Sequence, residues 1–346
     1  MVSALLVLTN CVDAPIVPVQ SIRALPSAIF NLDSPALDDI RDVEWVADST
    51  FVVIAGGAKI GVVKGGVSIT FLGRKGAGPG EFQNISSILR WGPDSFLVVD
   101  SGNRRLLFWS TDGRLLSELA LADDRLSYGP FLTRDGGVLK VFPSGGKIAR
   151  LLVISGPSEH PRARLDSSHG IAASCALCNT SIGPDGSIAF AEDPKAYRVQ
   201  RIDAHDRTIA PIVREHYPLI TRSPYEVDSV RAFRRAFRDQ MRASGLSDAN
   251  IRELLATLPV ATSKSMFVPG GIHHDDSGDL WLQRNVARGA PSEVDVFSPD
   301  GVQRGTVLLP PGFLVSRLRG QFVLGLQATD IGGTSIVVLT KPTFAN

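Results

Sequence analysis

The run His273-His274-Asp275-Asp276 is the densest group of side chains in the sequence that can bind a metal or transfer a proton. Imidazole and carboxylate groups are common metal ligands, and histidine changes its charge near neutral pH. The run precedes the apolar stretch 280–282, so we expect it at the start of a strand. Two roles stay open: His273, His274 and Asp275 bind a ligand, or His274 and Asp275 only shape a turn. The pattern favours the turn.

Cysteine supplies a second candidate, because Cys175 and Cys178 form a Cys-x-x-Cys pair. Three interpretations stay open: a local disulfide, half of a metal site, or two buried thiols. A four-ligand zinc site needs further ligands, and a redox pair of this type belongs in a thioredoxin-like βαβ context that the sequence lacks. A disulfide is favoured if the chain is exported to an oxidising compartment.

Other chemistries find little support in the sequence. Gly76, Gly78 and Gly80 resemble a phosphate-binding loop, but no Lys-Ser/Thr pair follows them. The sequence contains no Gly-x-Ser-x-Gly motif, which leaves a serine hydrolase unsupported. The formal net charge is +1 and aromatic residues are 7%, so neither a basic field nor a stacking surface points to nucleic acid.

The elements that must position these residues repeat along the chain. Six short turns each precede an apolar run, at intervals of about 40 to 50 residues once a helical insertion is set aside. Continuously apolar runs fit strands buried on both faces, and this period with several strands in each unit is typical of a propeller. The six turns are Asp48-Ser49, Asp94-Ser95, Asp135-Gly136, Asp185-Gly186, Ser277-Gly278 and Arg319-Gly320.

The second unit carries the clearest motif. The segments 78–82 (GPGEF) and 97–106 (LVVDSGNRRL) resemble an NHL-type repeat, and the chain looks like the uncharacterised six-bladed propellers of bacteria, many of them exported lipoproteins. The resemblance implies an all-β, six-bladed propeller over residues 21–346, but no agreed activity. Within the motif we expect Asp100, Asn103 and Arg105 to shape a turn, and we keep Arg104 as a candidate ligand-binding residue.

A propeller binds metals or substrates through residues that several blades contribute to the central channel. NHL-like lyases use histidine ligands, and lactonase-like propellers use acidic and amide ligands. In the other blades the positions that match His273 are Ser87, Phe131, Ser181 and Arg317, and none of these is a strong metal ligand. We therefore predict no metal and no cofactor.

Residues 1–20 are predicted to be a signal-like segment and linker. The apolar run 4–8 leads to Cys11 and resembles the end of a bacterial lipoprotein signal, with Cys11 as the lipidated residue. The alternative is a disordered tail. After it, the strand-like segment 21–32 is expected to pair with the last blade, whose outer strand is missing from the sequence pattern.

Residues 223–259 have the periodicity of a helical hairpin between the fourth and fifth blades. Ser223, Pro224 and Glu226 form a helix-start signal, and Gly245 ends the first helix. We expect the hairpin to dock on a propeller face and to turn its arginines outward. The apolar residues of its two helices are Val230, Phe233, Phe237, Met241, Ile251, Leu254, Leu255 and Leu258.

These patterns favour a non-catalytic binding or scaffold propeller outside the cytoplasm, with a protein or small-molecule ligand on one propeller face. We expect a monomer that does not bind nucleic acid and that reaches a membrane only through a lipid on Cys11. The alternative is a channel-centred, metal-dependent lyase or lactonase-like enzyme. Bound divalent metal in the purified protein distinguishes the two.

Overall fold

The structure is a computed structural model of the chain. It describes residues 21–23, 26–30, 40–47, 50–56, 59–65, 68–120, 131–132, 138–139, 141–144, 148–155, 162–172, 179–191, 193–205, 207–243, 245, 247–256, 261–328 and 334–344. The predicted lipidation residue Cys11 and the pair Cys175 and Cys178 lie outside these residues.

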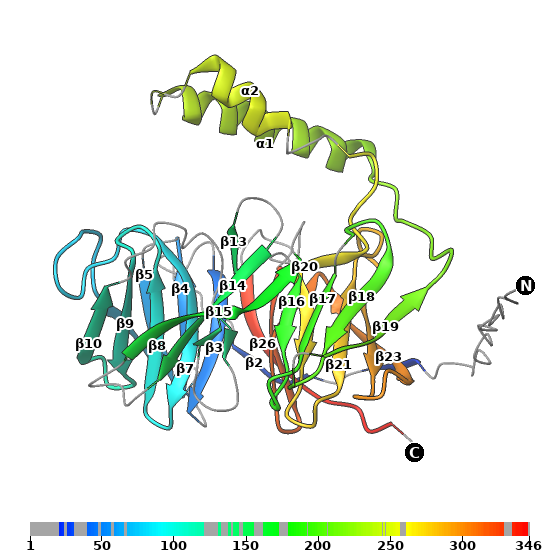
Figure 1. Cartoon of the computed structure of the whole chain (residues 1–346), viewed down its shortest axis with the longest axis horizontal. Coiled ribbons are helices and arrows are strands. Elements are labelled where there is room, and N and C mark those ends of the chain that lie inside the picture. The colour runs from blue at the N-terminus through cyan, green and yellow to red at the C-terminus, as the bar shows by residue number, and fades with distance from the viewer. Residues whose placement is uncertain are drawn as a thin grey trace, which may run out of the picture.

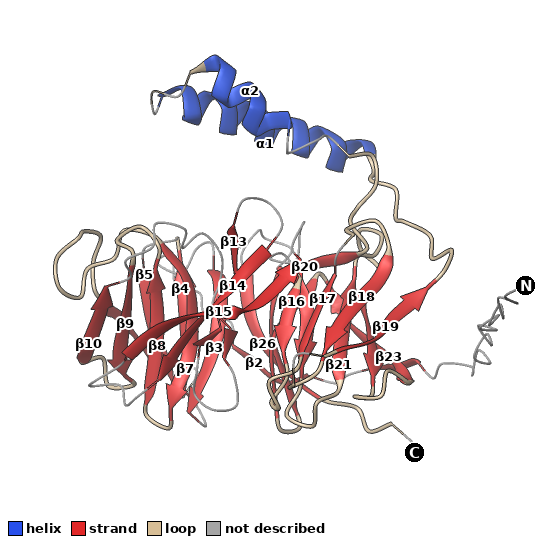
Figure 2. Cartoon of the chain, in the orientation of Figure 1, coloured by secondary structure: helices blue, strands red, loops and turns tan. Residues whose placement is uncertain are grey.

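The described strands form consecutive antiparallel sheets arranged as the blades of a propeller (Figures 1 and 2). Blade one contains β3 (Ile40–Ala47), β4 (Thr50–Ala55), β5 (Lys59–Lys64) and β6 (Ser68–Leu72). Blade two contains β7 (Ile85–Gly92), β8 (Ser95–Asp100), β9 (Arg105–Ser110) and β10 (Leu115–Ala120). Blade three contains β11 (Phe131–Leu132), β12 (Val138–Leu139), β13 (Val141–Ser144), β14 (Ile148–Ser155) and β15 (Arg162–Ala172).

The second half of the chain continues the series. Blade four contains β16 (Thr180–Ile182), β17 (Ile188–Ala191), β18 (Tyr197–Ile202) and β19 (Thr208–Arg214). Blade five contains β20 (Phe267–His274), β21 (Leu280–Arg284), β22 (Pro291–Phe297) and β23 (Gln303–Pro311). Blade six contains β24 (Phe313–Arg319), β25 (Phe322–Ala328) and β26 (Thr334–Thr340).

The first strand of each blade is the inner strand, next to the propeller axis. Neighbouring inner strands touch: β24 contacts β3, β3 contacts β7, β11 contacts β16, and β20 contacts both β16 and β24. In blades one, two, four and five, four antiparallel strands return the chain to the end where the blade began, so the inner strand of the next blade starts at that same end. We call this the hairpin end, because the helical insertion joins β19 to β20 there, and the other the turn end.

The N-terminal segment closes the propeller, as predicted. Strand β2 (Pro26–Phe30) pairs antiparallel with β26, Phe30 opposite Ile336, and becomes the outer strand of blade six. Strand β1 (Ser21–Arg23) was not predicted as a separate element. It pairs in parallel with β23 and adds a fifth strand to blade five. The N-terminal segment thus ties the last two blades together and covers two sheet edges.

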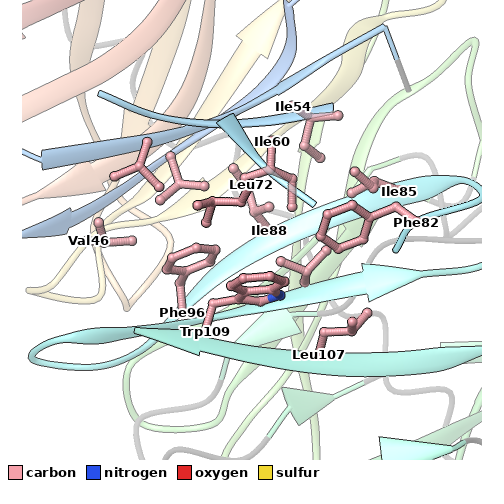
Figure 3. Packing of buried hydrophobic residues seen from close by; sticks show 13 residues of the cluster. Val46, Ile54, Ile60, Leu72, Phe82, Ile85, Ile88, Phe96, Leu107 and Trp109 are labelled. Atoms are coloured by element: carbon pink, nitrogen blue, oxygen red, sulfur yellow. The ribbon is translucent and has the colours of Figure 1, made fainter. Parts of the chain in front are cut away.

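In blades one, two, four and five the apolar runs found in the sequence are the second strands, and they are buried on both faces as expected. All six residues of β4 and all six of β8 are buried. Side chains from blades one and two meet in a cluster without a charged member (Figure 3). Its members are Val46, Val52, Ile54, Ile60, Val62, Leu72, Phe82, Ile85, Ile88, Phe96, Val98, Leu107 and Trp109.

The insertion is the predicted helical hairpin, α1 (Pro224–Ala243) and α2 (Asp248–Ala256). The helix-start signal acts as expected: the Ser223 N–H donates to Glu226 Oε2 (2.8 Å), and the Glu226 N–H donates to Ser223 Oγ (3.3 Å). Gly245 follows the first helix with a φ of 85°. None of the described helices is long and apolar enough to span a membrane.

The expectation that the hairpin docks on a propeller face is wrong. The two helices form an arm that leaves the propeller at the β19–β20 connection (Figure 1), and no residue of α1 is buried. The helices pack on each other instead, which leaves Ile251 of α2 only 2% exposed. Phe233 stacks on Phe237 with ring centroids 6.0 Å apart, yet it is 61% exposed. Stacking within α1 therefore replaces the contact that we expected with a blade.

Candidate functional site

The sequence suggested that His273 and His274 start an inner strand. In the structure they are instead the last two residues of the inner strand β20. They lie opposite Trp281 and Leu280 of β21, and consecutive strand residues point to opposite faces of a sheet. The backbone N–H of His274 donates to Ser181 Oγ of blade four (2.9 Å), and ring nitrogen Nδ1 lies 3.1 Å from the same oxygen. His273 faces blade six. The two imidazoles therefore cannot bind one ion together.

The partly buried His273 lies between blades five and six. Its Nε2 atom is buried and has no hydrogen-bond partner among the described residues. Burial, followed by the positive charge of Arg317, lowers the pKa of His273 to about 3. The ring is therefore neutral at physiological pH and does not take up a proton there.

Arg317 joins three blades at the channel. Its Nε donates to Glu44 Oε2 (2.6 Å), and one terminal nitrogen donates to Asp42 Oδ2 (3.2 Å) and to the Ile88 carbonyl (3.0 Å). The other terminal nitrogen donates to the Ser316 carbonyl (2.7 Å). Burial raises the pKa of Glu44, and Arg317 acts against that rise. The guanidinium is therefore held by bonds that join inner strands of blades six, one and two.

A β-bulge aims Arg317 at this position. Val315 pairs with Gly325 and Arg317 with Leu324, so Ser316 is an extra residue in β24. In a regular strand, Val315 and Arg317 are two positions apart and would point to the same face, toward blade five. The bulge turns Arg317 toward β3 instead.

Asp275 forms a turn, as the favoured interpretation predicted. Its Oδ1 accepts hydrogen bonds from the Ser277 N–H (2.9 Å), the Ser277 hydroxyl (2.6 Å) and the Asp279 N–H (3.0 Å). Its Oδ2 accepts from Trp281 Nε1 (3.3 Å) and pairs with Lys341 Nζ (3.1 Å). Both carboxylate oxygens are thus used within the protein.

Arg104 lies far from the histidine pair in the fold. It is exposed in the β8–β9 turn with a φ of 53°, and that turn is at the hairpin end, whereas His274 lies at the turn end. The neighbouring motif is structural, as expected: Asp100 Oδ1 accepts from the Asn84 N–H (3.0 Å), and Arg105 donates to the Gly78 carbonyl (2.7 Å). The structure therefore does not join Arg104 to the candidates of blade five.

A pocket of about 310 Å³ opens between blades four and five at the turn end. His274 lines it together with Arg201, a residue that the sequence analysis did not single out. Arg201 is 8% exposed and donates from Nε to the Ala210 carbonyl (2.9 Å) and from a terminal nitrogen to the Pro299 carbonyl (2.7 Å). No signal in the strand YRVQRI marks Arg201, because its partner at residue 299 is distant in sequence. Among the described residues, no group of three or more His, Cys, Asp or Glu is arranged to hold a metal.

A second polar group lies between the same two blades. Asp295 of β22 is fully buried and accepts a hydrogen bond from the Tyr197 hydroxyl (2.7 Å). Its Oδ2 also pairs with Arg214 (3.2 Å) and Arg284 (2.9 Å), and its Oδ1 accepts from the Thr306 hydroxyl (2.6 Å). Burial, followed by the Asp295 charge, raises the pKa of Tyr197 well above its ordinary value. This carboxylate joins blade four to blade five.

Comparison with known proteins adds no family. No family model and no curated protein matches the chain. Among solved structures, a catalytically inactive virginiamycin B lyase from Staphylococcus aureus, crystallised with quinupristin, is 12% identical with a TM-score of 0.45, covering 92% of this chain and 99% of its own. A luciferin-regenerating enzyme is 13% identical with a TM-score of 0.46, covering 89% and 95%. The calcium-binding protein regucalcin from Agrobacterium tumefaciens is 12% identical with a TM-score of 0.46, covering 94% and 97%.

Such values say nothing about what this chain binds or catalyses. The assignment as an all-β propeller rests on the sheets and their order around the axis.

Proposed function

We propose that the chain is a non-catalytic binding propeller that recruits a protein partner through its helical hairpin. The observation that carries the proposal is the arm itself, which stands off the blades with Phe233 61% exposed; at its base Tyr225 is 65% exposed, with Arg288 of blade five over one side of its ring (4.7 Å). Large exposed aromatic side chains on a rigid helix are typical anchors of a protein interface.

The arm is held firmly at its base. The Glu226 carboxylate pairs with Lys264 Nζ (2.7 Å), and both side chains are mostly buried. Hydrogen bonds from Lys264 and then from Ser223 lower the pKa of Glu226 to about 2. Lys264 also donates to the Val286 carbonyl in blade five (2.8 Å). A fixed base lets the arm present its aromatic residues without a large loss of entropy on binding.

The charge of α1 indicates the kind of partner. The helix carries five arginines and three acidic residues. Exposed arginines beside aromatic residues fit a groove with an apolar floor and an acidic rim. We therefore propose a protein partner with such a groove, rather than a second copy of the chain.

Photocrosslinking in the native host tests the proposal. Phe233 is replaced by benzoylphenylalanine in the full chain, and Leu314, an exposed apolar residue of blade six, is replaced in the matched control. We expect one heterologous protein to be crosslinked from position 233 and none from position 314. With that protein purified, Phe233→Ser and Arg235→Glu should each weaken its binding by about tenfold or more.

Two outcomes would overturn the proposal. The first is crosslinking at position 233 to another copy of the chain alone, together with a dimer in light scattering. The second is the same crosslinked proteins from positions 233 and 314.

A channel-centred enzyme is the second candidate, and His273 favours it. A buried ring nitrogen without a partner among the described residues, close to a guanidinium, is a feature of sites that hold a polar group of a substrate. Metal analysis of the purified protein distinguishes the candidates: one equivalent of divalent metal that is lost in His273→Asn would favour the enzyme. Metal content unchanged in that variant would count against it.

The location of the protein is part of the same proposal. We propose a monomer outside the cytoplasm, with six blades of NHL type and a lipid on Cys11. Mass spectrometry of the N-terminal peptide from a membrane fraction tests the anchor, and an unmodified peptide from Met1 through Cys11 would rule it out.

A further inference from the structure

We infer that the pocket between blades four and five binds a small, uncharged ligand rich in hydroxyl groups, of monosaccharide size. This inference is independent of the hairpin, which joins the chain at the opposite end of the propeller. The pocket is lined mainly by the turns that follow β16, β18, β20 and β22, and blades four and five each supply polar groups to it.

The inner part of the pocket supplies hydrogen-bond donors. Arg201 is nearly buried, and its guanidinium packs over Gly301, where a Cβ atom would lie 2.7 Å from a terminal nitrogen. A guanidinium has five N–H groups, and the bonds of Arg201 to backbone carbonyls use three of them. The others are available to a ligand. Ser181 Oγ accepts the His274 N–H and has one proton of its own to donate; we assign that proton to Nδ1, which places the ring proton on Nε2. His274 is thereby a second donor.

The mouth of the pocket supplies acceptors. Asp185 is exposed, and its carboxylate accepts hydrogen bonds from the Ser187 N–H (2.9 Å) and the Ser187 side chain, which leaves further lone pairs of its two oxygens for a ligand. Asp276 is also exposed, and its Oδ2 accepts the Gly320 N–H (2.6 Å), which leaves its Oδ1. A hydroxyl group matches both ends of such a pocket, because it donates to a carboxylate and accepts from an N–H group.

The charges decide between classes of ligand. Burial lowers the pKa of His274 to about 4, so the ring is neutral at pH 7. Arg201 is then the one cation among the lining residues, and it faces three carboxylates, those of Asp185, Asp203 and Asp276, of which Asp203 pairs with Arg207 (2.7 Å). An anion such as phosphate would meet net repulsion, and a neutral polyol would not.

Size and apolar contacts agree with this class. A volume of about 310 Å³ is at the lower end of the roughly 300 to 1,000 Å³ that ligand pockets occupy. The walls also contain apolar side chains, on which the C–H groups of a sugar ring can pack. These are Ile188, Ile202, Ile209, Leu280 and Pro299.

Saturation-transfer NMR and calorimetry on the full chain test the inference with glucose, galactose and mannose as probes. Inorganic phosphate and glycine are the charged comparison probes. We expect at least one sugar to bind and neither charged probe to do so. Asp185→Asn keeps the acceptor for Ser187 but loses the charge-assisted bond, so the sugar should bind about tenfold more weakly. Arg201→Met should abolish binding.

The controls separate this site from the rest of the molecule. Asp112→Asn changes an exposed carboxylate of blade two, 85% exposed, and Phe233→Ser changes the hairpin; both should bind the sugar as the parent does. If Arg201→Met does not fold, Asp185→Asn still decides the question. Binding of no sugar, binding of phosphate or glycine instead, or sugar binding that Asp185→Asn leaves unchanged would each overturn the inference.

Discussion

Two blade interfaces of this propeller are built on different principles. Blades one and two meet through a cluster of apolar side chains from both sheets, and no charged group belongs to it (Figure 3). Blades four and five also share an apolar cluster, which includes Ala189, Ala191 and Phe267, but a fully buried carboxylate lies beside it. Asp295 there binds two arginines and a tyrosine.

The difference shows that one propeller can contain both a closely packed blade interface and a blade interface with a pocket. Large apolar side chains pack closely in the first interface, so its contribution is to stability. The second interface has a pocket at the turn end, lined by Arg201 and His274 among others, and the helical arm is inserted between the same two blades. Directional bonds hold these blades together where apolar contact is reduced.

The largest expected effect is on the second interface. Asp295→Ala removes the carboxylate shared by the half-buried Arg214 and the buried Arg284, and Arg284 then still pairs with Glu293. Breaking a buried ion pair on one side costs about 3–5 kcal/mol in the free energy of unfolding. Urea denaturation measures the loss. Asp300→Ala, an exposed carboxylate of the following turn, is the matched control and should stay within about 0.5 kcal/mol of the parent. Equal losses in the two variants would contradict the interpretation of Asp295.

Acid should lower the free energy of unfolding mainly through the blades that contain His273 and His274, and less through the apolar interface of blades one and two. The folded-state pKa values of His273 and His274 are lowered to about 3 and about 4, from 6.5 in the unfolded chain. Between these values the unfolded state binds more protons, so the free energy of unfolding falls as pH decreases from about 6.5 to 4. We expect a loss of about 2 kcal/mol for each of the two histidines by pH 4.5.

Urea midpoints measured across this range check the slope. His274→Gln cannot be protonated and should flatten the dependence. A parent stability that does not change over the range would show that the histidines are not buried in their neutral form.

A smaller effect is expected in the apolar interface. Ile88 is fully buried in the cluster between blades one and two. Ile88→Val removes one methylene group and should lower the free energy of unfolding by about 1 kcal/mol, equally at pH 7 and at pH 5. Val302→Ala, at a site 66% exposed, is the control and should have little effect. If the loss of unfolding free energy in Ile88→Val depended on pH, the two interfaces would not differ as we propose.

The smallest effect is expected in the arm. Arg242 pairs with Asp248 across the helical hairpin (2.8 Å), and both side chains are more than half exposed. Exposed pairs contribute about 0–1 kcal/mol and are screened by salt. Arg242→Ala should therefore leave the melting of the propeller unchanged, as measured by circular dichroism of the β signal. A loss comparable with that of Asp295→Ala would mean that the arm supports the blades.

Local features of this protein were readable from the sequence. The paired turn and apolar run marked the second strand of each blade, Ser223 and Glu226 marked the start of α1, and Asp100 and Asn103 marked a turn. Each of these depends on contacts within a few residues or within one sheet. Closure by the N-terminal strand was also predictable, because the last blade lacked an outer strand.

The tertiary structure alone decided the site. The extra residue Ser316 turns Arg317 toward Glu44, and a bulge is visible only from the register of two paired strands. Arg201 and Asp295 have hydrogen-bond partners 98 and 81 residues away in the sequence. No local sequence pattern could therefore predict their roles. The helices of the hairpin were predictable from their apolar spacing, but their packing was not. Only the tertiary structure decides whether Phe233 contacts a blade or solvent.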